Sequence, residues 1–513
     1  MFNQAPTSTP WYRSRPALLG SLVVLLLAAA GLYILFRPKT DPNIDAHYTT
    51  LEQHRAQQQQ SAPPPQATEP QMTSEPLASP PPNPTEQQAA PPANASPTPS
   101  QNAAVASATV TNQASPQIAE PPASTRPRRN YWTNFRGPNR DGRYNDATVK
   151  TNFGAEGLPL LWRQPIGGGY ASFVVADGAA FTIEQRRAQE VVAAYHVETG
   201  RELWTHSWTG EFRESMGGDG PRATPTWDAG RIYALGAAGE LRCLDAKTGK
   251  LIWSKNILSD NGATNLQWGM AASPLIVGDN VIVQPGGGSG KSVVAYNKTT
   301  GAPLWKAMND QASYTSPMLV TLAGKRQLLV VTARRIAGLS PEDGSVLWEH
   351  PWSNSASINI SQPIIVNANQ FFISAGYGKG ASLVEISGAG KTFAARAVWE
   401  NNSIKNKFNS SVLHEGHIYG LDEGILTCVD VTTGERKWKG GRYGYGQVLL
   451  AGGTLIITTE EGEIVFVKAA PAQHEEVSRF SALQGRTWNN PAIADGRLLV
   501  RNATQMACYK LTD

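Results

Sequence analysis

The chain has 513 residues, among them 14 tryptophans and 36 prolines, and its formal net charge is +4. From residue 131 onward it carries 37 Lys and Arg against 34 Asp and Glu, and this near-neutral balance argues against nucleic acid as the main partner. It has only three cysteines, Cys243, Cys428 and Cys508, which make neither a disulfide framework nor a zinc motif. Because each falls at a small-residue position of a repeat, we interpret them as buried packing residues.

The N-terminal region predicts a membrane anchor. Residues 1–16 are polar, and we expect them to be cytoplasmic. Residues 17–36 form a run of 20 residues without charge, which is long enough to cross a bilayer of about 30 Å as a helix. A cleaved signal peptide is the alternative, but Arg37-Pro38-Lys39 does not resemble a small-residue cleavage site. We therefore predict a retained signal anchor.

The flanking charges leave the orientation of this anchor open, because Arg13 and Arg15 are balanced by Arg37 and Lys39. With the N-terminus inside, a bacterial protein of this kind would be a single-pass protein of the inner membrane. Its bulk would then lie in the periplasm.

Residues 37–128 predict a disordered linker. Residues 41–130 hold 18 of the 36 prolines and no tryptophan, so this segment cannot bury enough apolar area to offset its ordering entropy. A flexible coil of about 85 residues would span roughly 50 Å. We expect a spacer that holds the folded domain clear of the membrane, with passive low complexity as the alternative.

The folded domain is predicted to cover residues 129–513 as eight repeated units. Each unit opens with a small or polar residue and continues with a short strand, a turn and another strand. The mean spacing of about 45 residues is typical of β-propeller blades. The eight openings are Ser172, Thr224, Ser273, Ser316, Gln362, Ser411, Gln447 and Asn490.

A shorter phrase recurs five times within these units. In every copy a Gly at a turn is followed four residues later by Trp, and a small residue stands six positions before the Gly. The last unit ends without this phrase, whereas Trp162 precedes the first opening. We therefore predict that the segment before Ser172 supplies the strand that completes the final blade and removes its free edge.

The phrase resembles the tryptophan-docking motif of the quinoprotein-type (PQQ-like) β-propeller repeat family, and Trp132-x-x-Phe-Arg-Gly-Pro resembles the start of a bacterial subgroup of it. The resemblance covers residues 131–513 and implies an all-β, eight-bladed propeller. It implies that each Trp packs on the Gly turn of a neighbouring blade. The implied docking residues are Gly200, Trp204, Gly249, Trp253, Gly301, Trp305, Gly344, Trp348, Gly434 and Trp438.

Two units depart from this pattern. Trp399 lacks its Gly, and no Trp follows the strand that begins at Glu463. We expect these two blades to dock differently.

Two functions follow from the resemblance. One branch of the superfamily consists of dehydrogenases that hold PQQ and Ca²⁺ in the central funnel. Another includes the propeller subunit of the outer-membrane β-barrel assembly machinery, which resembles this chain, is a scaffold and binds no PQQ. This chain lacks the adjacent Cys-Cys pair that is typical of the dehydrogenases.

Several polar and aromatic residues near the openings could line a funnel. They could equally pack or satisfy exposed backbone. These candidates for cofactor binding are Arg222, Trp268, Asn359, Asn409 and Asn490. We predict no catalytic residue and no metal ligand.

Two further motifs do not support chemistry. Residues 285–292 resemble a phosphate loop, but a strand follows them and not the helix that would hold phosphate. His414 and His417 stand three apart on a predicted turn, so they do not match a helical zinc motif.

We therefore predict a membrane-anchored periplasmic propeller, expected to be monomeric, that binds envelope proteins through its surface and needs no cofactor. The alternative is a PQQ-dependent oxidoreductase or PQQ-binding sensor with Ca²⁺. The sequence thus leans away from an enzyme without deciding the question.

Overall fold

The computed structural model describes residues 42–60, 131–154, 156–390 and 392–512, which all belong to one compact unit. The predicted anchor at residues 17–36 and most of the predicted linker lie outside the described residues, so both remain predictions. Within the described ranges, no helix is both long and apolar enough to span a membrane.

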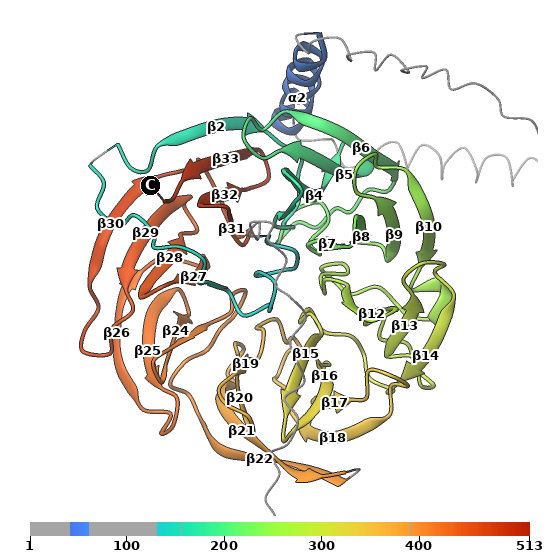
Figure 1. Ribbon diagram of the computed structural model, residues 1–513, viewed down its shortest axis with the longest axis vertical. Helices are drawn as coiled ribbons and strands as arrows, with labels where there is room; N and C mark the ends of the chain where they lie inside the picture. Colours follow the sequence, from blue (N-terminus) through green and yellow to red (C-terminus); the bar gives the residue numbers. More distant parts are fainter. Residues whose placement is uncertain (1–41, 61–130, 155, 391, 513) are drawn as a thin grey trace, which may run out of the picture. The chain divides into compact units, whose positions relative to one another are not determined.

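The prediction of an eight-bladed propeller is confirmed: the strands of residues 143–510 form eight sheets arranged in a ring (Figure 1). We number the blades in chain order. Blade 1 contains β3 (Val174–Ala176), β4 (Ala179–Arg186), β5 (Gln189–His196) and β6 (Glu202–Thr209). Blade 2 contains β7 (Thr226–Asp228), β8 (Arg231–Leu235), β9 (Glu240–Asp245) and β10 (Leu251–Asn256), and the short 3-10 helix η1 (Ser259–Asn261) follows. Blade 3 contains β11 (Leu275–Val277), β12 (Asn280–Val283), β13 (Val293–Asn297) and β14 (Pro303–Ala307).

The other blades repeat this order from the inner strand to the outer strand. Blade 4 contains β15 (Met318–Leu322), β16 (Lys325–Val331), β17 (Arg335–Leu339) and β18 (Val346–Pro351). Blade 5 contains β19 (Ile364–Ile365), β20 (Gln370–Ala375), β21 (Gly380–Ala389) and β22 (Thr392–Asn401). Blade 6 contains β23 (Val412–His414), β24 (His417–Asp422), β25 (Ile425–Asp430) and β26 (Arg436–Arg442). Blade 7 contains β27 (Gln447–Ala451), β28 (Thr454–Thr458), β29 (Glu463–Lys468) and β30 (Glu476–Ser481), and blade 8 contains β31 (Ala492–Ala494), β32 (Arg497–Arg501) and β33 (Gln505–Lys510).

The inner hairpins follow from turn chemistry. In blade 1 the two residues between β3 and β4, Asp177 and Gly178, have φ angles of 51° and 78°. Positive φ at both positions is the type I′ geometry whose twist matches that of antiparallel strands. The second and third strands of a blade are mostly buried on both faces, as in β4, whereas the outer strand β6 alternates between more and less exposed side chains.

The N-terminal segment closes the ring, as predicted. Strand β2 (Leu160–Pro165) pairs with β33 in antiparallel register, with Trp162 opposite Cys508, and completes blade 8. The two strands lie side by side in Figure 1. A second N-terminal strand, β1 (Arg143–Tyr144), adds in parallel to β27 on the inner side of blade 7.

Six of the eight blades are fastened to the next by a Trp of the outer strand, whose indole N–H donates to a carbonyl of the next blade. The indole Nε1 of Trp204 in blade 1 donates to the carbonyl of Ala246 in blade 2 at 3.0 Å. A Cβ added to Gly249 would lie only 2.5 Å from the ring of Trp204, and Gly249 has a φ of 72°. Glycine is therefore required there twice, for space and for backbone conformation. The same pairing joins Trp162 with Gly200, Trp253 with Gly301 and Trp305 with Gly344.

The column of small residues in the repeat has a geometric cause. Each small residue lies directly across from the docking Trp of its own blade, as Cys243 does opposite Trp253 and Ala295 opposite Trp305. Cys243, Cys428 and Cys508 are all buried and free. Burial raises the pKa of the Cys243 and Cys428 thiols to about 11 and that of Cys508 to about 12.

Two docking expectations are corrected. Trp399 docks in the usual way, with its Nε1 donating to Val431 at 3.0 Å and its ring against Gly434. Trp348 does not: its Nε1 bonds Gln327 of its own blade at 2.6 Å, and its ring stacks on Phe371 of blade 5. The reason is that a Trp uses the Gly turn of the following blade, so the missing Gly of blade 5 affects Trp348 and not Trp399. Trp438 keeps the hydrogen bond to the next blade, at 3.0 Å to the Ala470 carbonyl, although the turn of blade 7 has no Gly.

Blade 7 has no outer Trp, as expected from its sequence, and is covered by the N-terminal segment. Phe480 of β30 lies against Gly157. Phe153 packs edge-on against Phe466 and Phe480, with ring centroids 5.2 and 5.5 Å apart. Residues before β2 therefore replace the missing Trp contact.

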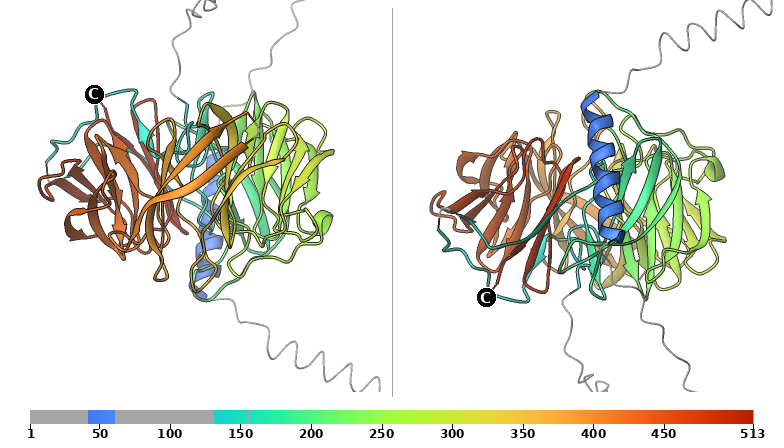
Figure 2. Two further views of the ribbon diagram at one scale, coloured as in Figure 1. Left: turned by 90° about the horizontal axis from the view of Figure 1, so that it is seen from below. Right: turned by 90° about the horizontal axis from the view of Figure 1, so that it is seen from above.

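The prediction of disorder is wrong for one part of the linker. Residues 42–60, within the span 37–128 that predicts disorder, form the helix α2 (Pro42–Gln60). It runs along the edge of the propeller beside β2 (Figure 2). A polar helix of this length is marginal in isolation; tertiary contacts, which composition does not reveal, stabilise it.

We expect Gly249→Ala to destabilise the propeller more than Gly178→Ala does. Both glycines have φ above 70°, but a Cβ at Gly178 meets nothing within 4 Å. Each substitution should cost about 1–2 kcal/mol for the left-handed backbone, and the clash with Trp204 should add about 1–3 kcal/mol at Gly249. Equal free energies of unfolding in denaturant titrations of the two variants would contradict the docking role.

Deleting residues 131–165 should lower the melting temperature by about 10 °C or more, at about 2–4 °C per kcal/mol, because both N-terminal strands, β1 and β2, are lost. Deleting residues 66–120 is the matched control and should leave the melt unchanged. Calorimetry of the two truncated proteins makes the comparison, and equal melts would refute closure by the N-terminal strand.

Candidate functional site

The segment 131–144 lies inside the ring, and it places two arginines in the centre. Arg136 and Arg140 both have left-handed backbone, with φ of 60° and 59°. Their side chains are 1% and 2% exposed. Gly142, whose amide donates to the Arg136 carbonyl at 2.9 Å, closes the turn between them.

The two guanidinium groups bind backbone carbonyls at the starts of the inner strands. Arg136 donates to Ser411 of blade 6 at 2.9 Å and to Val448 of blade 7 at 3.1 Å. Arg140 donates to the carbonyls of Ser273 at 3.1 Å and Pro317 at 3.0 Å, in blades 3 and 4. The two arginines therefore join blades on both sides of the ring.

Burial opposes the charge of both groups. It lowers the pKa of Arg140 to about 9, and it lowers the pKa of Arg136 to about 10 against the opposing effect of the Asp141 carboxylate. Both guanidinium groups therefore remain charged at neutral pH. Their Nη groups donate mainly to carbonyl dipoles, which do not cancel the charge, whereas neither Nε has a hydrogen-bond partner among the described residues.

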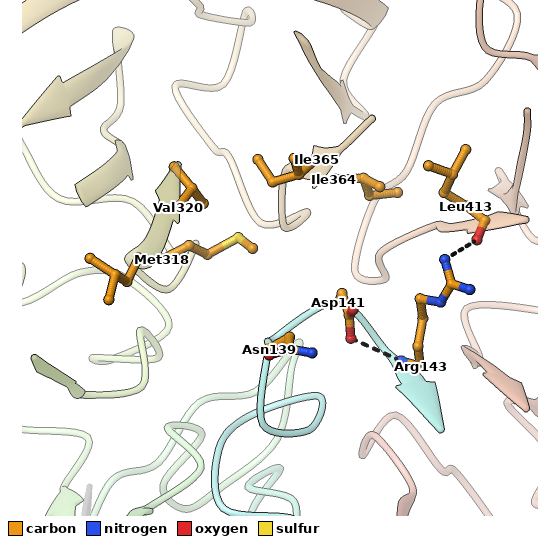
Figure 3. A pocket seen from close by; sticks show the side chains of 9 residues that line it. Asn139, Asp141, Arg143, Met318, Val320, Ile364, Ile365 and Leu413 are labelled. Atoms are coloured by element: carbon orange, nitrogen blue, oxygen red, sulfur yellow. Dashed lines mark hydrogen bonds between the residues drawn. The ribbon is translucent and has the colours of Figure 1, made fainter. Parts of the chain in front are cut away.

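Two cavities lie along the central channel, and the inner segment lines both. The smaller, of about 210 Å³, is lined by Asn139, Asp141 and Arg143 together with apolar residues of blades 4 to 6. Figure 3 shows Arg143 in it, with its backbone amide bonded to Asp141 and its guanidinium to the Leu413 carbonyl, at 3.1 and 3.2 Å. The Asp141 carboxylate and one nitrogen of the Arg143 guanidinium are thus paired within the lining, whereas Arg143 Nε has no partner among the described residues.

The larger cavity, of about 390 Å³, is the candidate functional site. Its volume is in the range of small-ligand and peptide side-chain pockets. Aromatic rings dominate its wall, and its floor includes Phe135 of the inner segment. The other aromatic lining residues are Tyr170, Trp268, Tyr314, Tyr377, Phe408 and Trp488.

The charged residues of this lining are cations. The Arg222 guanidinium lies 5.3 Å from the Tyr170 ring centroid and donates to the Gly218 carbonyl at 2.6 Å. The Lys407 ammonium lies 5.6 Å from the centroids of both Tyr377 and Phe408. Burial lowers the pKa of Arg222. The lining includes no Asp or Glu, so a ligand with an anionic group suits this cavity.

Hydrogen bonds join several of the opening residues of neighbouring blades. The Ser172 amide donates to Thr224 Oγ1 at 2.9 Å, and the Ser316 amide donates to Gln362 Oε1 at 2.7 Å. Ser172 Oγ joins blade 1 to blade 8 by donating to the Asn490 carbonyl at 2.6 Å. These polar groups hold the inner strands together and are largely unavailable to a ligand.

The structure brings three of the five predicted funnel residues together. Arg222, Trp268 and Asn490 line the larger cavity. Asn359 is buried and donates to the Thr332 carbonyl at 2.8 Å, and buried Asn409 accepts from Asn406 at 2.9 Å. Neither is among the lining residues, because both side chains turn into the strand ends.

The sequence reasoning missed most of the aromatic wall, although the repeat contains a signal for it. In six of the eight units, the residue two positions before the opening residue lines the larger cavity. These six are Tyr170, Arg222, Ala271, Tyr314, Ile360 and Trp488. Lys407 and Phe408 lie four and three residues before the opening Ser411 and follow no such regularity.

The motif that resembles a phosphate loop and the pair His414 and His417 both lie at hairpin turns. Residues 285–292 connect β12 with β13, and Gly287 forms an isolated bridge with Lys291. His414 and His417 flank the turn between β23 and β24. Among the described residues, no three His, Cys, Asp or Glu side chains gather as a metal-ligand set.

Comparisons of sequence find two kinds of similar protein. The family described as outer membrane protein assembly factor BamB matches residues 187–440. BamB of Burkholderia pseudomallei is 23% identical over 325 residues, which are 59% of this chain and 75% of that protein. BamB of Yersinia pestis is 22% identical over 334 residues, 60% of this chain and 79% of that protein. Quinohemoprotein alcohol dehydrogenase ADH-IIG of Pseudomonas putida is 27% identical over 162 residues, 30% of this chain and 22% of the enzyme.

Comparisons of structure give the same fold. BamB from Moraxella catarrhalis superposes with a TM-score of 0.50 at 17% identity and covers 69% of this chain and 100% of its own. Quinohemoprotein alcohol dehydrogenase ADHIIG from Pseudomonas putida superposes with a TM-score of 0.52 at 13% identity, covering 74% of this chain and 80% of its own. At these identities the likeness establishes the fold alone.

Replacing Arg140 should leave its buried carbonyl partners without a hydrogen-bond donor. We expect Arg140→Met to lower the free energy of unfolding by about 3 kcal/mol or more, because buried carbonyls left without a donor cost about 1–3 kcal/mol each. Arg201→Met, the same change at an exposed position of blade 1, should stay within about 0.5 kcal/mol of the parent. Chemical denaturation measures both, and equal losses would argue against the central role of Arg140.

Proposed function

We propose that this chain, a PQQ-like repeat propeller that resembles BamB, is a protein-binding scaffold of the bacterial cell envelope. The observation that carries the proposal is the lining of the larger cavity, in which cations and aromatic rings occur together without a carboxylate. The name of the BamB relatives supports a partner in outer membrane protein assembly.

The chemistry of the cavity suggests what a partner presents to it. Seven aromatic side chains favour an aromatic or aliphatic group, because rings bury large apolar areas and pair edge to face. Arg222 and Lys407 favour a carboxylate beside that group. We therefore propose that the partner inserts a loop or terminus with an acidic residue next to an aromatic one.

The location of the protein is also a proposal. The uncharged run at residues 17–36 would anchor the chain in the inner membrane, with the propeller as a monomer in the periplasm. The BamB relatives support an envelope location by their name only.

The quinoprotein alternative is tested by the donor groups of the cavity. Ca²⁺ takes about six to eight oxygen ligands, often carboxylates, and the lining offers the amide oxygens of Gln447 and Asn490 and tyrosine hydroxyls. Asn490 Oδ1 already accepts from Arg136 at 3.3 Å, which places a cation beside it. This set does not fit Ca²⁺, so no redox step is assigned to the cavity.

A pair of short peptides tests the proposal. Fluorescein-labelled Asp-Phe-Asp-Phe should bind the full chain in detergent at least about tenfold more tightly than Lys-Phe-Lys-Phe, which corresponds to about 1.4 kcal/mol. Lys407→Glu should reverse this preference, whereas Lys247→Glu, the same charge change at an exposed turn, should leave it unchanged. Fluorescence anisotropy measures each dissociation constant.

Equal affinities for the two peptides, or an unaltered preference in Lys407→Glu, would contradict the proposed partner chemistry. Adding PQQ with Ca²⁺ to residues 126–513 tests the alternative by absorbance and dye reduction. Stoichiometric binding with turnover would overturn the scaffold in favour of an oxidoreductase.

A further inference from the structure

The helix α2 presents one built face to the propeller. Tyr48, Leu51 and Arg55 follow one another at spacings of three and four residues, so they lie on the same side of the helix. They are 6%, 1% and 6% exposed, whereas Gln53 between them is exposed. Since α2 is otherwise polar, this face is what orders it.

One half of the docking surface is the strand that closes the ring. His47 Nε2 lies 2.8 Å from the carbonyl of Ile166, directly after β2, and Arg55 donates to the Pro165 carbonyl at 2.8 Å. Gln58 donates to Gln164 Oε1 at 3.3 Å. These contacts use the exposed edge of β2.

The other half is blade 1. Arg55 Nε lies 3.3 Å from Glu202 Oε2, and its guanidinium lies over the Tyr195 ring at 4.9 Å. Glu202 also pairs with Arg186 at 2.5 Å. Arg187 of blade 1 reaches back to Glu52 of the helix at 2.7 Å. The helix thus spans the seam at which β2 of blade 8 meets blade 1, and Arg55 reaches both sides.

This interface is built to bind with moderate strength. Its buried apolar residues are Tyr48 and Leu51, and the other contacts are ion pairs, hydrogen bonds and the packing of Arg55 on the Tyr195 ring. The Arg187–Glu52 pair is about half exposed, with side-chain exposures of 44% and 57%. Exposed pairs of this kind contribute little and weaken with salt. The interface is therefore specific, through buried Arg55, but reversible.

We infer that α2 is a reversible clasp that sets the length of the tether of the propeller. The inference rests on the proposed anchor at residues 17–36, which ends six residues before Pro42. With α2 docked, the connection from residue 36 to the propeller extends at most about 20 Å. With α2 released, residues 37–130 would all lie between the proposed anchor and the propeller, and a flexible coil of that length would span about 55 Å. Docking holds the propeller at the membrane, and release lets it reach deep into the periplasm.

Matched variants isolate the docking contact. Arg55→Gln and Gln53→Glu change the net charge equally, and both keep good helix formers, but only the first removes contacts to Glu202 and Tyr195. Spin labels at Thr50→Cys and Glu415→Cys, both exposed, report the distance between helix and propeller in the full chain. The native thiols do not compete, since they are buried and burial raises the pKa of each to about 11 or 12.

We expect a narrow distance distribution in the labelled parent and in Gln53→Glu, and a broad one in Arg55→Gln. A broad distribution in the parent, or a narrow one in Arg55→Gln, would overturn the clasp. Unchanged melts of the three proteins would show that the propeller itself is intact.

A second arm measures reach in vesicles of phosphatidylethanolamine and phosphatidylglycerol. Energy transfer from a dye at Glu415→Cys to labelled lipid should fall by at least about half in Arg55→Gln, because the tether lengthens from about 20 Å to about 55 Å. Equal transfer in the two proteins would overturn the tether role. Release of the parent by carbonate would refute the proposed anchor instead, and the spin-label contrast would still decide whether the helix is clasped.

Discussion

The contact between a Trp ring and a Gly turn is the constraint on which the propeller depends. A four-stranded blade has two apolar faces and cannot be stable alone, so its faces must be covered by its neighbours. Trp204 covers one such junction and directs its indole N–H to Ala246 at 3.0 Å. The buried apolar side chains accordingly form clusters that span neighbouring blades, such as the one that contains Phe181 and Ile232. Five of the eight junctions use a Trp ring against a Gly turn, and the inner arginines add contacts across the ring.

The sequence predicted the fold well because the same physical problem is solved repeatedly. Gly with positive φ, Trp four residues later and a small residue opposite that Trp are three requirements of one junction, so they recur as columns. Closure by the segment around Trp162 followed from counting these columns. What the columns could not tell was direction: Trp399 docks normally and Trp348 does not, because each Trp uses the turn of the next blade.

The candidate site was less predictable, because its residues vary from blade to blade. Arg222, Trp268 and Asn490 were found by their proximity to the openings, whereas Lys407 and Phe408 belong to no column. Asn359 and Asn409 satisfied the same reasoning, yet they bond within the strand ends. Helix α2 was not predicted, because it is ordered by the packing of Tyr48, Leu51 and Arg55 on a surface that is distant in the sequence. Local composition carries no information about such contacts. The candidate site is thus built from the positions at which the blades differ in sequence.

Closure by β2 also determines the order in which contacts can form during synthesis. Strand β2 leaves the ribosome more than 300 residues before its partner β33. Arg140 likewise must wait for blades 3 and 4, and Arg136 for blades 6 and 7. The part of the folded domain that is synthesised first is therefore the last to form all of its contacts. Until the C-terminus is complete, the nascent protein is an open arc with a free edge at each end, which gives a chaperone a defined interval in which to act.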